Sequence, residues 1–466
     1  MQYTLTLLEE DRARLEEYVF SRRGREGAAY ILCGRSVTES EIRLLVREVI
    51  PVAEEHYLLR EAVRLSIDSY SYASVAKRAR LISASVIFVH GHPYGPDDFS
   101  DQDNREEPKL VDFLSEQIPG VPHGTLVLTP GVLANCRIWE GDTWVQLSRV
   151  RVIGRRFWFK DFSSEEIPLP EFFDRQVRAF GPDIQRLLRK LHIGVVGLGG
   201  TGSPVVEELA RLGVGKISTF DGDSLEYSNV TRVYGSSTSD EGKNKAQISA
   251  AHVKHIGMGT VVCTYPRHIT DEGTAKRLRE CDIIFGCTDK QAPRGILVQL
   301  ALRYLIPVFD MGVKIDAPDQ VIRGIDGRVT TIMPGEACLF CRRRISAEMI
   351  RLESLSPEER QLLADEDYAP QLETENPAVI TFTTAVATQA VSEFLHRLTG
   401  FMGEERRSSE VLMFFHETAI RTNRTSPAEG CLCTKKDLWG RGDGRDFLGL
   451  MWPEQVEELE LLSIES

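Results

Sequence analysis

The chain has 466 residues, a formal net charge of −13 at pH 7 and a hydrophobic fraction of 42%. This length is enough for two or three domains with sizeable cores. The acidic balance disfavours a dedicated nucleic-acid surface, which is normally basic. A membrane span is also disfavoured, because no run of about twenty apolar residues occurs in the sequence.

The cysteines and the N-terminal residues indicate a cellular compartment. The first residues carry early acids and lack a long apolar stretch, so we expect no signal peptide. Nine cysteines are present, and four of them stand in two close pairs. This usage fits metal-binding thiols better than a disulfide scaffold. We therefore expect a cytoplasmic protein.

The first motif is a histidine pair followed by a serine and an aspartate, in the pattern H-x-H-x7-S-x2-D. The apolar run from Ala84 predicts a buried strand that ends at His90, and residues i and i+2 of a strand share a face. His90 and His92 are therefore predicted to bind one metal ion, with Asp103 as a third ligand on a helix that Ser100 caps. Three protein ligands leave the fourth position of a catalytic zinc ion to water. The alternative is a loop histidine pair without a metal.

At these residues the chain resembles the JAB/JAMM metalloprotease family, zinc isopeptidases that trim or remove ubiquitin-like proteins. The resemblance covers about residues 1–150 and implies a cytidine-deaminase-like α/β domain. It implies a glutamate on an earlier strand as general base for the zinc-bound water. Glu26 is the candidate, one residue further from Gly34 than the family's usual spacing. Ser100 would donate a hydrogen bond to the oxyanion of the tetrahedral intermediate.

The second motif is a glycine-rich loop after a predicted strand that ends at Gly197. Ser203 as the cap and Pro204 in the first turn predict a helix that ends near Gly213. A strand, a glycine loop and a helix in this order let backbone amides and the helix dipole hold phosphates. With Asp221 about twenty residues further on, the pattern by itself fits a dinucleotide site of a dehydrogenase.

Basic residues further along the chain favour a nucleoside triphosphate instead. Arg232 and Lys245 bring more positive charge to the loop than a dinucleotide pyrophosphate needs. Asp289 follows another predicted strand, where it is placed to hold Mg²⁺ or to orient the nucleotide. This combination resembles the ThiF/MoeB and ubiquitin-activating adenylyltransferase family over about residues 170–435.

The second resemblance implies a Rossmann-like domain with a mostly parallel sheet, which binds ATP and Mg²⁺. It implies that Asp221 holds the ribose and that Asp289 contacts the magnesium or the carrier's terminal carboxylate. It also implies a homodimer, because the family supplies an arginine from the partner protomer in an R-Q motif, here Arg175–Gln176. The residues around the phosphates would be Gly197, Gly199, Gly200, Gly202, Asn229, Arg232 and Lys245.

Two cysteine pairs, Cys338 with Cys341 and Cys431 with Cys433, predict a structural zinc site with four thiolates. Many adenylyltransferases of this family carry C-x2-C twice, whereas the second pair here is C-x-C. Two pairs of buried free cysteines are the alternative. Ubiquitin-activating enzymes carry a catalytic cysteine in a segment that would lie at about 342–380, where this sequence has none after Cys341. We therefore expect adenylation without a conventional thioester step, with a conjugating protein or sulfur donor taking the acyl group.

The sequence thus predicts a metallopeptidase domain at 1–150, a linker at 151–170, an adenylyltransferase domain at 171–435 and a tail at 436–466 that ends in a short acidic helix. Together the resemblances imply a bifunctional enzyme of a bacterial ubiquitin-like pathway. It would cleave after the C-terminal glycine of a ubiquitin-like or sulfur-carrier protein and adenylate that end. The alternatives are adenylation of a peptide or small-molecule carboxylate, an NAD-linked oxidoreductase, and a scaffold with both sites inactive.

Overall fold

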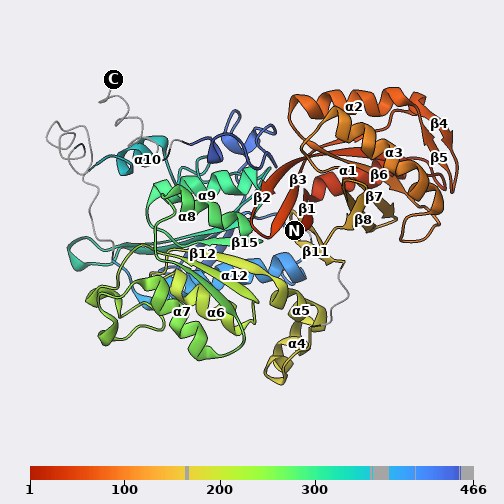
Figure 1. Ribbon diagram of the computed structural model, residues 1–466. Helices are drawn as coiled ribbons and strands as arrows, with labels where there is room; N and C mark the ends of the chain where they lie inside the picture. Colours follow the sequence, from red (N-terminus) through yellow and green to blue (C-terminus); the bar gives the residue numbers. More distant parts are fainter. Residues whose placement is uncertain (163–166, 357–358, 360–376, 405, 451, 453–466) are drawn as a thin grey trace. The chain divides into compact units, whose positions relative to one another are not determined.

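The computed structural model describes residues 1–162, 167–356, 359, 377–404, 406–450 and 452 (Figure 1). By their internal contacts the residues form two compact units. The first comprises Met1–Glu166, Arg303–Leu305 and Lys436–Gly444, and the second comprises Ile167–Leu302, Ile306–Lys435 and Arg445–Ser466. Among the described residues, no helix combines the length and the apolar character that a membrane crossing requires.

The first unit is built on a mixed nine-stranded sheet in the order β11-β10-β1-β3-β2-β6-β7-β8-β9. A separate hairpin pairs β4 (Tyr57–Arg60) with β5 (Leu65–Ile67), and the helices are α1 (Glu9–Val19), α2 (Ser69–Leu81) and α3 (Asp101–Gln117). The sheet strands are β1 (Gln2–Leu8), β2 (Ala28–Val37), β3 (Glu41–Pro51), β6 (Ser85–Gly91), β7 (Gly124–Thr129), β8 (Val132–Glu140), β9 (Thr143–Gln146), β10 (Arg149–Ile153) and β11 (Trp158–Asp161).

Helices cover both faces of this sheet, which therefore has two apolar cores. Along β2, Ile31 packs with α1 residues such as Leu15, while its neighbour Tyr30 packs with Val75 of α2 and Leu114 of α3. Alternate residues of a strand point to opposite faces, so both kinds of position are buried. This explains why the central strands are continuous apolar runs rather than alternating ones.

The first unit extends beyond the predicted boundary at residue 150. β10 pairs in parallel with β1, and β11 pairs antiparallel with β10, so much of the expected linker at 151–170 belongs to the sheet. Residues 436–444 of the expected tail also belong to this unit. There Asp443 accepts hydrogen bonds from the Val37 N–H at 2.7 Å and from the Tyr304 hydroxyl at 2.8 Å. The acidic helix predicted at the end of the tail lies outside the described residues.

The second unit contains an eight-stranded sheet in the order β14-β13-β12-β15-β16-β17-β18-β19. As predicted, its larger part is parallel, from β14 to β16, and the remaining pairings are antiparallel. The strands are β12 (His192–Val196), β13 (Lys216–Phe220), β14 (Val261–Tyr265), β15 (Ile283–Gly286), β16 (Val308–Asp316), β17 (Gly324–Ile332), β18 (Glu410–Phe414) and β19 (Ala419–Asn423). The helices are α4 (Asp174–Phe180), α5 (Pro182–Lys190), α6 (Gly202–Arg211), α7 (Lys245–Ile256), α8 (Glu272–Arg277), α9 (Gln291–Arg303), α10 (Ala347–Glu353) and α12 (Ile380–Thr399).

The strand order reverses at β12, because β13 lies on one side of it and β15 on the other. In open α/β sheets, ligands bind beyond the carboxyl ends of the strands at such a point. The glycine loop after β12 opens here and leads into α6. The predicted cap of that helix is wrong, since the N-cap is Thr201, two residues before Ser203. The Ser203 hydroxyl instead donates to the Gly199 carbonyl at 2.8 Å and accepts the Tyr234 N–H at 3.0 Å.

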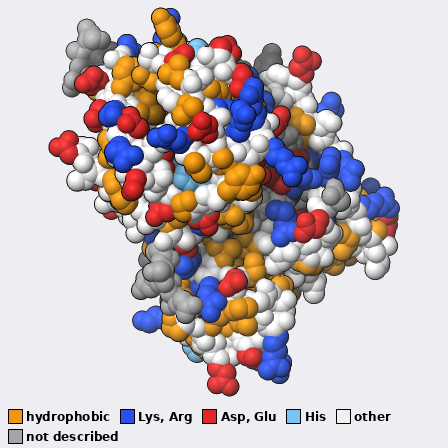
Figure 2. Space-filling model, turned by 90° about the vertical axis from the view of Figure 1, so that its right-hand side faces the viewer, with side chains coloured by type: hydrophobic (Ala, Val, Ile, Leu, Met, Phe, Trp, Pro, Cys, Tyr) orange, Lys and Arg blue, Asp and Glu red, His pale blue; other side chains and the backbone are white. Residues whose placement is uncertain are grey.

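Figure 2 shows one face of the molecule with its side chains coloured by type. Acidic, basic and apolar side chains all occur on it, and several Lys and Arg side chains gather on the right of the view. The net charge of −13 therefore does not form a uniformly acidic face in this view.

Two candidate functional sites

The predicted histidine-bearing strand is β6, with His90 near its end and His92 one residue beyond it. The two rings converge, with 3.1 Å between their Nε2 atoms. Both side chains are buried, at 2% and 5% exposure. The His92 N–H donates to the Leu128 carbonyl at 2.9 Å, which holds this residue against the end of β7. The sheet therefore presents two imidazole nitrogens to one point.

Asp103 reaches the same point from the first turn of α3. Its carboxylate oxygens lie 3.3 Å from His90 Nε2 and 3.5 Å from His92 Nε2. Ser100 caps the helix as predicted: its hydroxyl accepts the Asp103 N–H at 3.3 Å, and the Asp103 carboxylate accepts the Ser100 N–H at 2.7 Å. Ligand atoms of the three residues lie within 4.8 Å of one another. Two imidazoles and a carboxylate are a donor set that fits a catalytic zinc ion.

The candidate base, Glu26, lies two residues before β2, not on a strand as the resemblance implied. Its N–H donates to the Glu61 carbonyl at 2.7 Å instead of to a neighbouring sheet strand. Ala28 pairs with His90 across β2 and β6, so Glu26 is level with His92 in the register. Burial raises the pKa of the Glu26 carboxyl, while His90 and His92 oppose that rise. The side chain is 7% exposed and lies within electrostatic reach of the three candidate ligands.

In the second unit, the glycine loop has a conformation that side chains would obstruct. Gly197 has a φ of +85°, and a Cβ there would meet the Cys287 carbonyl oxygen at 2.9 Å. A Cβ on Gly202 would lie 1.8 Å from the carbonyl oxygen of Gly197. Only glycine fits at these two positions, so the loop turns tightly from β12 into α6. The turn leaves the backbone of the loop at the carboxyl end of the sheet.

Asp221 follows β13 and supports this loop from the side. One carboxylate oxygen accepts the Leu198 N–H at 2.6 Å, and the other accepts the Asp223 N–H at 2.8 Å. The side chain is buried, and burial raises its pKa. Lys245, the first residue of α7, approaches from the next segment, with its ammonium nitrogen 3.4 Å from the Asp223 carboxylate. A buried acid and a lysine therefore flank the glycine loop.

A cavity of about 1140 Å³ opens at this end of the sheet and gathers most of the predicted nucleotide-site residues. Asn229 is buried, and its amide donates to the Ser228 hydroxyl at 3.1 Å. The Arg232 guanidinium donates to the Ser228 carbonyl at 3.1 Å. The predicted residues that line the cavity are Gly197, Gly199, Gly200, Asp221, Asn229, Arg232, Lys245 and Asp289.

Arg175 does not line this cavity and lies exposed on α4. Its neighbour Gln176 donates to the Arg211 carbonyl at 2.8 Å, which fixes α4 to the end of α6. The resemblance assigned Arg175 to the site of a partner protomer, so its position in a single chain leaves that prediction open.

Sequence reasoning missed a buried charged group in the wall of the same cavity. Asp310 on β16 is fully buried, and its carboxylate lies 3.2 Å from Arg294 Nε and 2.5 Å from Arg328 Nη1. The two arginines come from α9 and β17 and line the cavity beyond Asp289. A charged residue inside an apolar strand was the available signal, because such groups are rarely buried without a partner.

The four paired cysteines come together in the second unit. Their sulfurs are separated by 3.9 Å for Cys338–Cys341, 3.6 Å for Cys338–Cys431 and 3.5 Å for Cys341–Cys433. A tetrahedral zinc ion with Zn–S bonds of about 2.3 Å would hold its sulfurs roughly 3.8 Å apart. The short C-x-C pair is therefore geometrically compatible with the predicted four-thiolate site. Elsewhere, Cys287 lines the larger cavity, but burial raises its thiol pKa well above the ordinary value.

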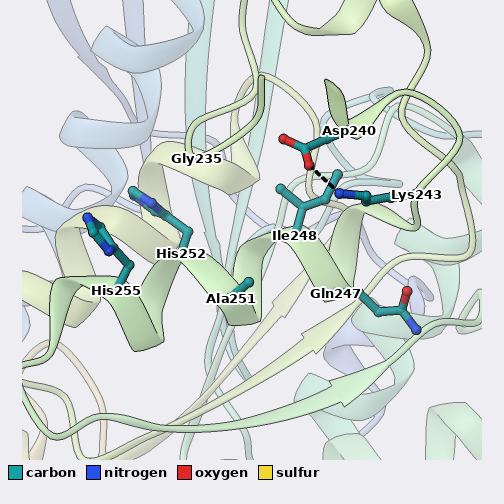
Figure 3. Close-up of a pocket in the computed structure, with 8 residues that line it drawn as sticks. All are labelled: Gly235, Asp240, Lys243, Gln247, Ile248, Ala251, His252 and His255. Carbon is teal, nitrogen blue, oxygen red and sulfur yellow. Dashed lines mark hydrogen bonds and ion pairs between the residues drawn. The ribbon is translucent and has the colours of Figure 1, made fainter. Parts of the chain in front are cut away.

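A smaller cavity of about 340 Å³ lies along α7 and the loop before it (Figure 3). Lys243 points into it and pairs with Asp240 at 2.8 Å. His252, on the far side, pairs with Glu207 of α6. None of its lining residues was predicted to act in catalysis. The lining residues are Gly235, Asp240, Lys243, Gln247, Ile248, Ala251, His252 and His255.

Comparison with known proteins finds a family match and several curated relatives. The ThiF family model matches residues 173–433. The chain is 30% identical over 122 residues to the sulfur carrier protein adenylyltransferase of Thermus thermophilus, covering 26% of this chain and 45% of that protein. It is 32% identical over 136 residues to the tRNA threonylcarbamoyladenosine dehydratase of Haemophilus influenzae, covering 29% and 52%. It is 24% identical over 291 residues to the ubiquitin-like modifier-activating enzyme 5 of Drosophila mojavensis, covering 59% and 66%.

The matches to the first curated relatives cover about half of the length of those proteins or less. Among solved structures, the crystal structure of Escherichia coli MccB with succinimide is similar at a TM-score of 0.45 and 15% identity, covering 57% of this chain and 75% of that one. The family match extends over more than half of the 466 residues. The chain therefore belongs to the ThiF family.

Proposed function

We propose that the second unit is an ATP-dependent adenylyltransferase that activates the C-terminal carboxylate of a ubiquitin-like or sulfur-carrier protein. One observation carries the proposal: a single cavity at the reversal of strand order gathers the glycine loop, the buried Asp221 and the cations Arg232 and Lys245. Family membership supports the reaction class. The names of the Thermus and Drosophila relatives supply the class of substrate.

The reaction follows from the charges around the cavity. Backbone amides of the glycine loop and the start of α6 would hold phosphate oxygens. Asn229, Arg232 and Lys245 would neutralise the charge that builds up on the phosphates. Asp221 would accept ribose hydroxyls, and Asp289 would hold Mg²⁺ or orient the carrier's carboxylate. A carboxylate oxygen then attacks the α-phosphorus, the bond to the bridging oxygen breaks, and pyrophosphate leaves with that electron pair.

The same proposal gives the first unit a zinc peptidase activity on the C-terminal tail of that carrier. His90, His92 and Asp103 would hold the zinc ion, which supplies a Lewis acid and lowers the pKa of bound water to about 7. Glu26 would accept a proton from the attacking water and return it to the leaving amine. The Ser100 hydroxyl would donate to the oxyanion. The convergence of three buried or half-buried ligands on one point supports this part of the proposal.

Placing both activities on one chain has a physical rationale, since both would act on one flexible, glycine-ended tail. Cleavage supplies the free carboxylate that adenylation consumes. The proposal also includes a structural zinc at the four cysteines, a homodimer in which Arg175 reaches the partner's site, and a cytoplasmic location. A conjugating protein or sulfur donor would take the acyl group afterwards.

The test uses the full chain incubated with ATP, magnesium and the small-protein fraction of its host. Intact-mass spectrometry should find a small protein that gains an AMP adduct at its C-terminus, and a Lys245→Ala chain should form none. If ATP binds but no protein gains an adduct, the carrier proposal is wrong. If AMP is instead released from ATP when a small carboxylic acid is added, a small-molecule carboxylate is favoured as the substrate.

A further inference from the structure

A second buried carboxylate, Glu107, lies behind the three candidate metal ligands. It stands one helical turn after Asp103 on α3 and is 4% exposed. One of its oxygens lies 3.3 Å from Nδ1 of His90. This is the ring nitrogen that faces away from the site, because Nε2 of the same ring faces His92 and Asp103.

The other oxygen of Glu107 is held by Arg137 of β8, whose side chain is also buried. Arg137 donates to it from Nε at 3.2 Å and from Nη2 at 2.5 Å. The same guanidinium donates to Asn104 Oδ1 at 2.7 Å and stacks 3.8 Å above the centre of the Phe99 ring. Arg137 thus contacts the residues on both sides of the capping segment 100–103 and holds Glu107 against His90.

Both histidines have an acceptor behind Nδ1, but at different closeness: Nδ1 of His92 is hydrogen-bonded, whereas Nδ1 of His90 and the facing Glu107 oxygen are buried and have no other hydrogen-bond partner among the described residues. Nδ1 of His92 lies 2.9 Å from the carbonyl oxygen of Pro96, as Nδ1 of His90 lies beside Glu107. A neutral imidazole carries one proton, and an acceptor behind Nδ1 places that proton there. Both Nε2 lone pairs then face the common point beside Asp103. The acceptor behind His92 is a backbone carbonyl. The acceptor behind His90 is the carboxylate of Glu107, whose negative charge is balanced by Arg137.

We propose that Glu107 is a positioning residue of the metal site, with Arg137 as its anchor. From its position 3.3 Å from Nδ1, Glu107 would accept the Nδ1–H of His90, fix the tautomer that leaves Nε2 free, and set the orientation of the ring. The inference rests on the proposed zinc site. Groups that hydrogen-bond to metal-bound histidines typically change metal affinity by about 10–100-fold when they are removed.

The test measures zinc affinity on the full chain by competition with a chromophoric chelator. The relevant zinc ion is defined as the one lost in His92→Ala, which separates it from any zinc at the cysteines. Glu107→Gln should weaken its binding by about 10-fold or more. Glu106→Gln is the matched control, because Glu106 is the adjacent exposed acid and pairs only with Lys109 at 2.9 Å among the described residues. Its zinc affinity should equal that of the parent chain.

Glu107→Gln leaves Arg137 without its counter-charge, so a second variant guards against misfolding. The double variant Glu107→Leu with Arg137→Met replaces the buried pair by apolar groups, a change that is often neutral for stability. This variant should keep the parent's circular dichroism spectrum and melting temperature yet bind zinc about 10–100-fold more weakly. Parental zinc affinity in a folded double variant would overturn the role of Glu107. If the parent itself lacks a zinc that depends on His92, the zinc site fails instead, and the inference falls with it.

Discussion

The carboxylate of Asp221 accepts the backbone N–H of Leu198 at 2.6 Å, which ties the end of β13 to the glycine loop after β12. The same group was expected only to bind a ribose. Because its second oxygen accepts the Asp223 N–H at 2.8 Å, Asp221 also shapes the loop that would hold the phosphates. Loop conformation and nucleotide affinity should therefore change together when this acid is altered.

Asp221→Asn should lower both the melting temperature and ATP affinity. The amide nitrogen cannot accept, so one of two backbone N–H groups loses its partner at a cost of about 1–3 kcal/mol. Differential scanning calorimetry and isothermal titration with ATP measure the two effects. Asp183→Asn, at an exposed residue of α5, is the control and should change neither. An Asp221→Asn chain with the parent's melting temperature would show that the two hydrogen bonds of Asp221 do not stabilise the loop.

Lys245→Ala should abolish pyrophosphate exchange and leave peptide cleavage intact. The Lys245 ammonium lies beside Asp223 in the larger cavity, where its positive charge would stabilise the transition state, and we expect the exchange rate to fall by about 100–1000-fold or more. Lys243→Ala is a close control, since Lys243 lies two residues away but faces the smaller cavity. Equal losses of exchange in the two variants would contradict a specific role of Lys245. Loss of cleavage in Lys245→Ala would contradict separate sites.

His92→Ala should lose one zinc ion per chain and all peptide cleavage. Its Nε2 is one of the three ligand atoms that the described residues bring together at the proposed site, and a site with two ligands binds zinc far more weakly. Metal content is measured by inductively coupled plasma mass spectrometry, beside cleavage of a carrier fusion. His56→Ala is the control, because His56 pairs with Asp68 away from the ligands. Cleavage that survives in His92→Ala would rule out the metallopeptidase.

Glu26→Gln should keep its zinc but lose turnover by about 100–10000-fold, since an amide cannot accept the proton of the attacking water. Single-turnover cleavage assays and metal analysis on the same sample separate the two effects. Glu61→Gln alters an exposed acid whose backbone carbonyl, rather than its side chain, contacts Glu26. It should behave as the parent does. An active Glu26→Gln chain would place the base on another residue.

Local sequence signals predicted the parts of the sites that short segments form by themselves. Ser100 and Asp103 form a capping box within one helical turn, and Gly197 occupies a left-handed turn that favours glycine. The position of Glu26 depends instead on pairing between β2 and β6, which spacing along the chain does not specify. The partners of Asp310 could not be predicted for the same reason, since the two arginines come from α9 and β17, which the sequence alone does not bring together.

The boundaries of the first unit were predicted less well for a related reason. The pairing that draws β10 into its sheet joins residues far apart in sequence, such as Thr4 with Arg149, and β11 follows as the neighbour of β10. Propensity in residues 149–161 indicates strands but not their partners. A charged, aromatic segment after an apparently complete domain therefore resembled a linker.

Glu353→Ala should weaken adenylation although Glu353 is not among the residues that line the larger cavity. The Glu353 carboxylate accepts the N–H groups of Gln291 and Ala292, at 2.9 and 2.7 Å, and so caps α9 from the end of α10. These N–H groups directly follow Asp289 and Lys290, which line the cavity. Loss of a cap costs about 1 kcal/mol, and the loop that carries Asp289 should become less ordered.

The measurement is pyrophosphate exchange as a function of ATP concentration, with the melting temperature determined in parallel. We expect a raised KM for ATP and a smaller change in kcat, because Glu353 contacts the backbone just after Asp289 and would act only through the position of that residue. Glu348→Ala, at an exposed acid on the same short helix, should leave both constants unchanged. Unaltered exchange in a Glu353→Ala chain with a lowered melting temperature would show that the cap stabilises α9 without acting on Asp289.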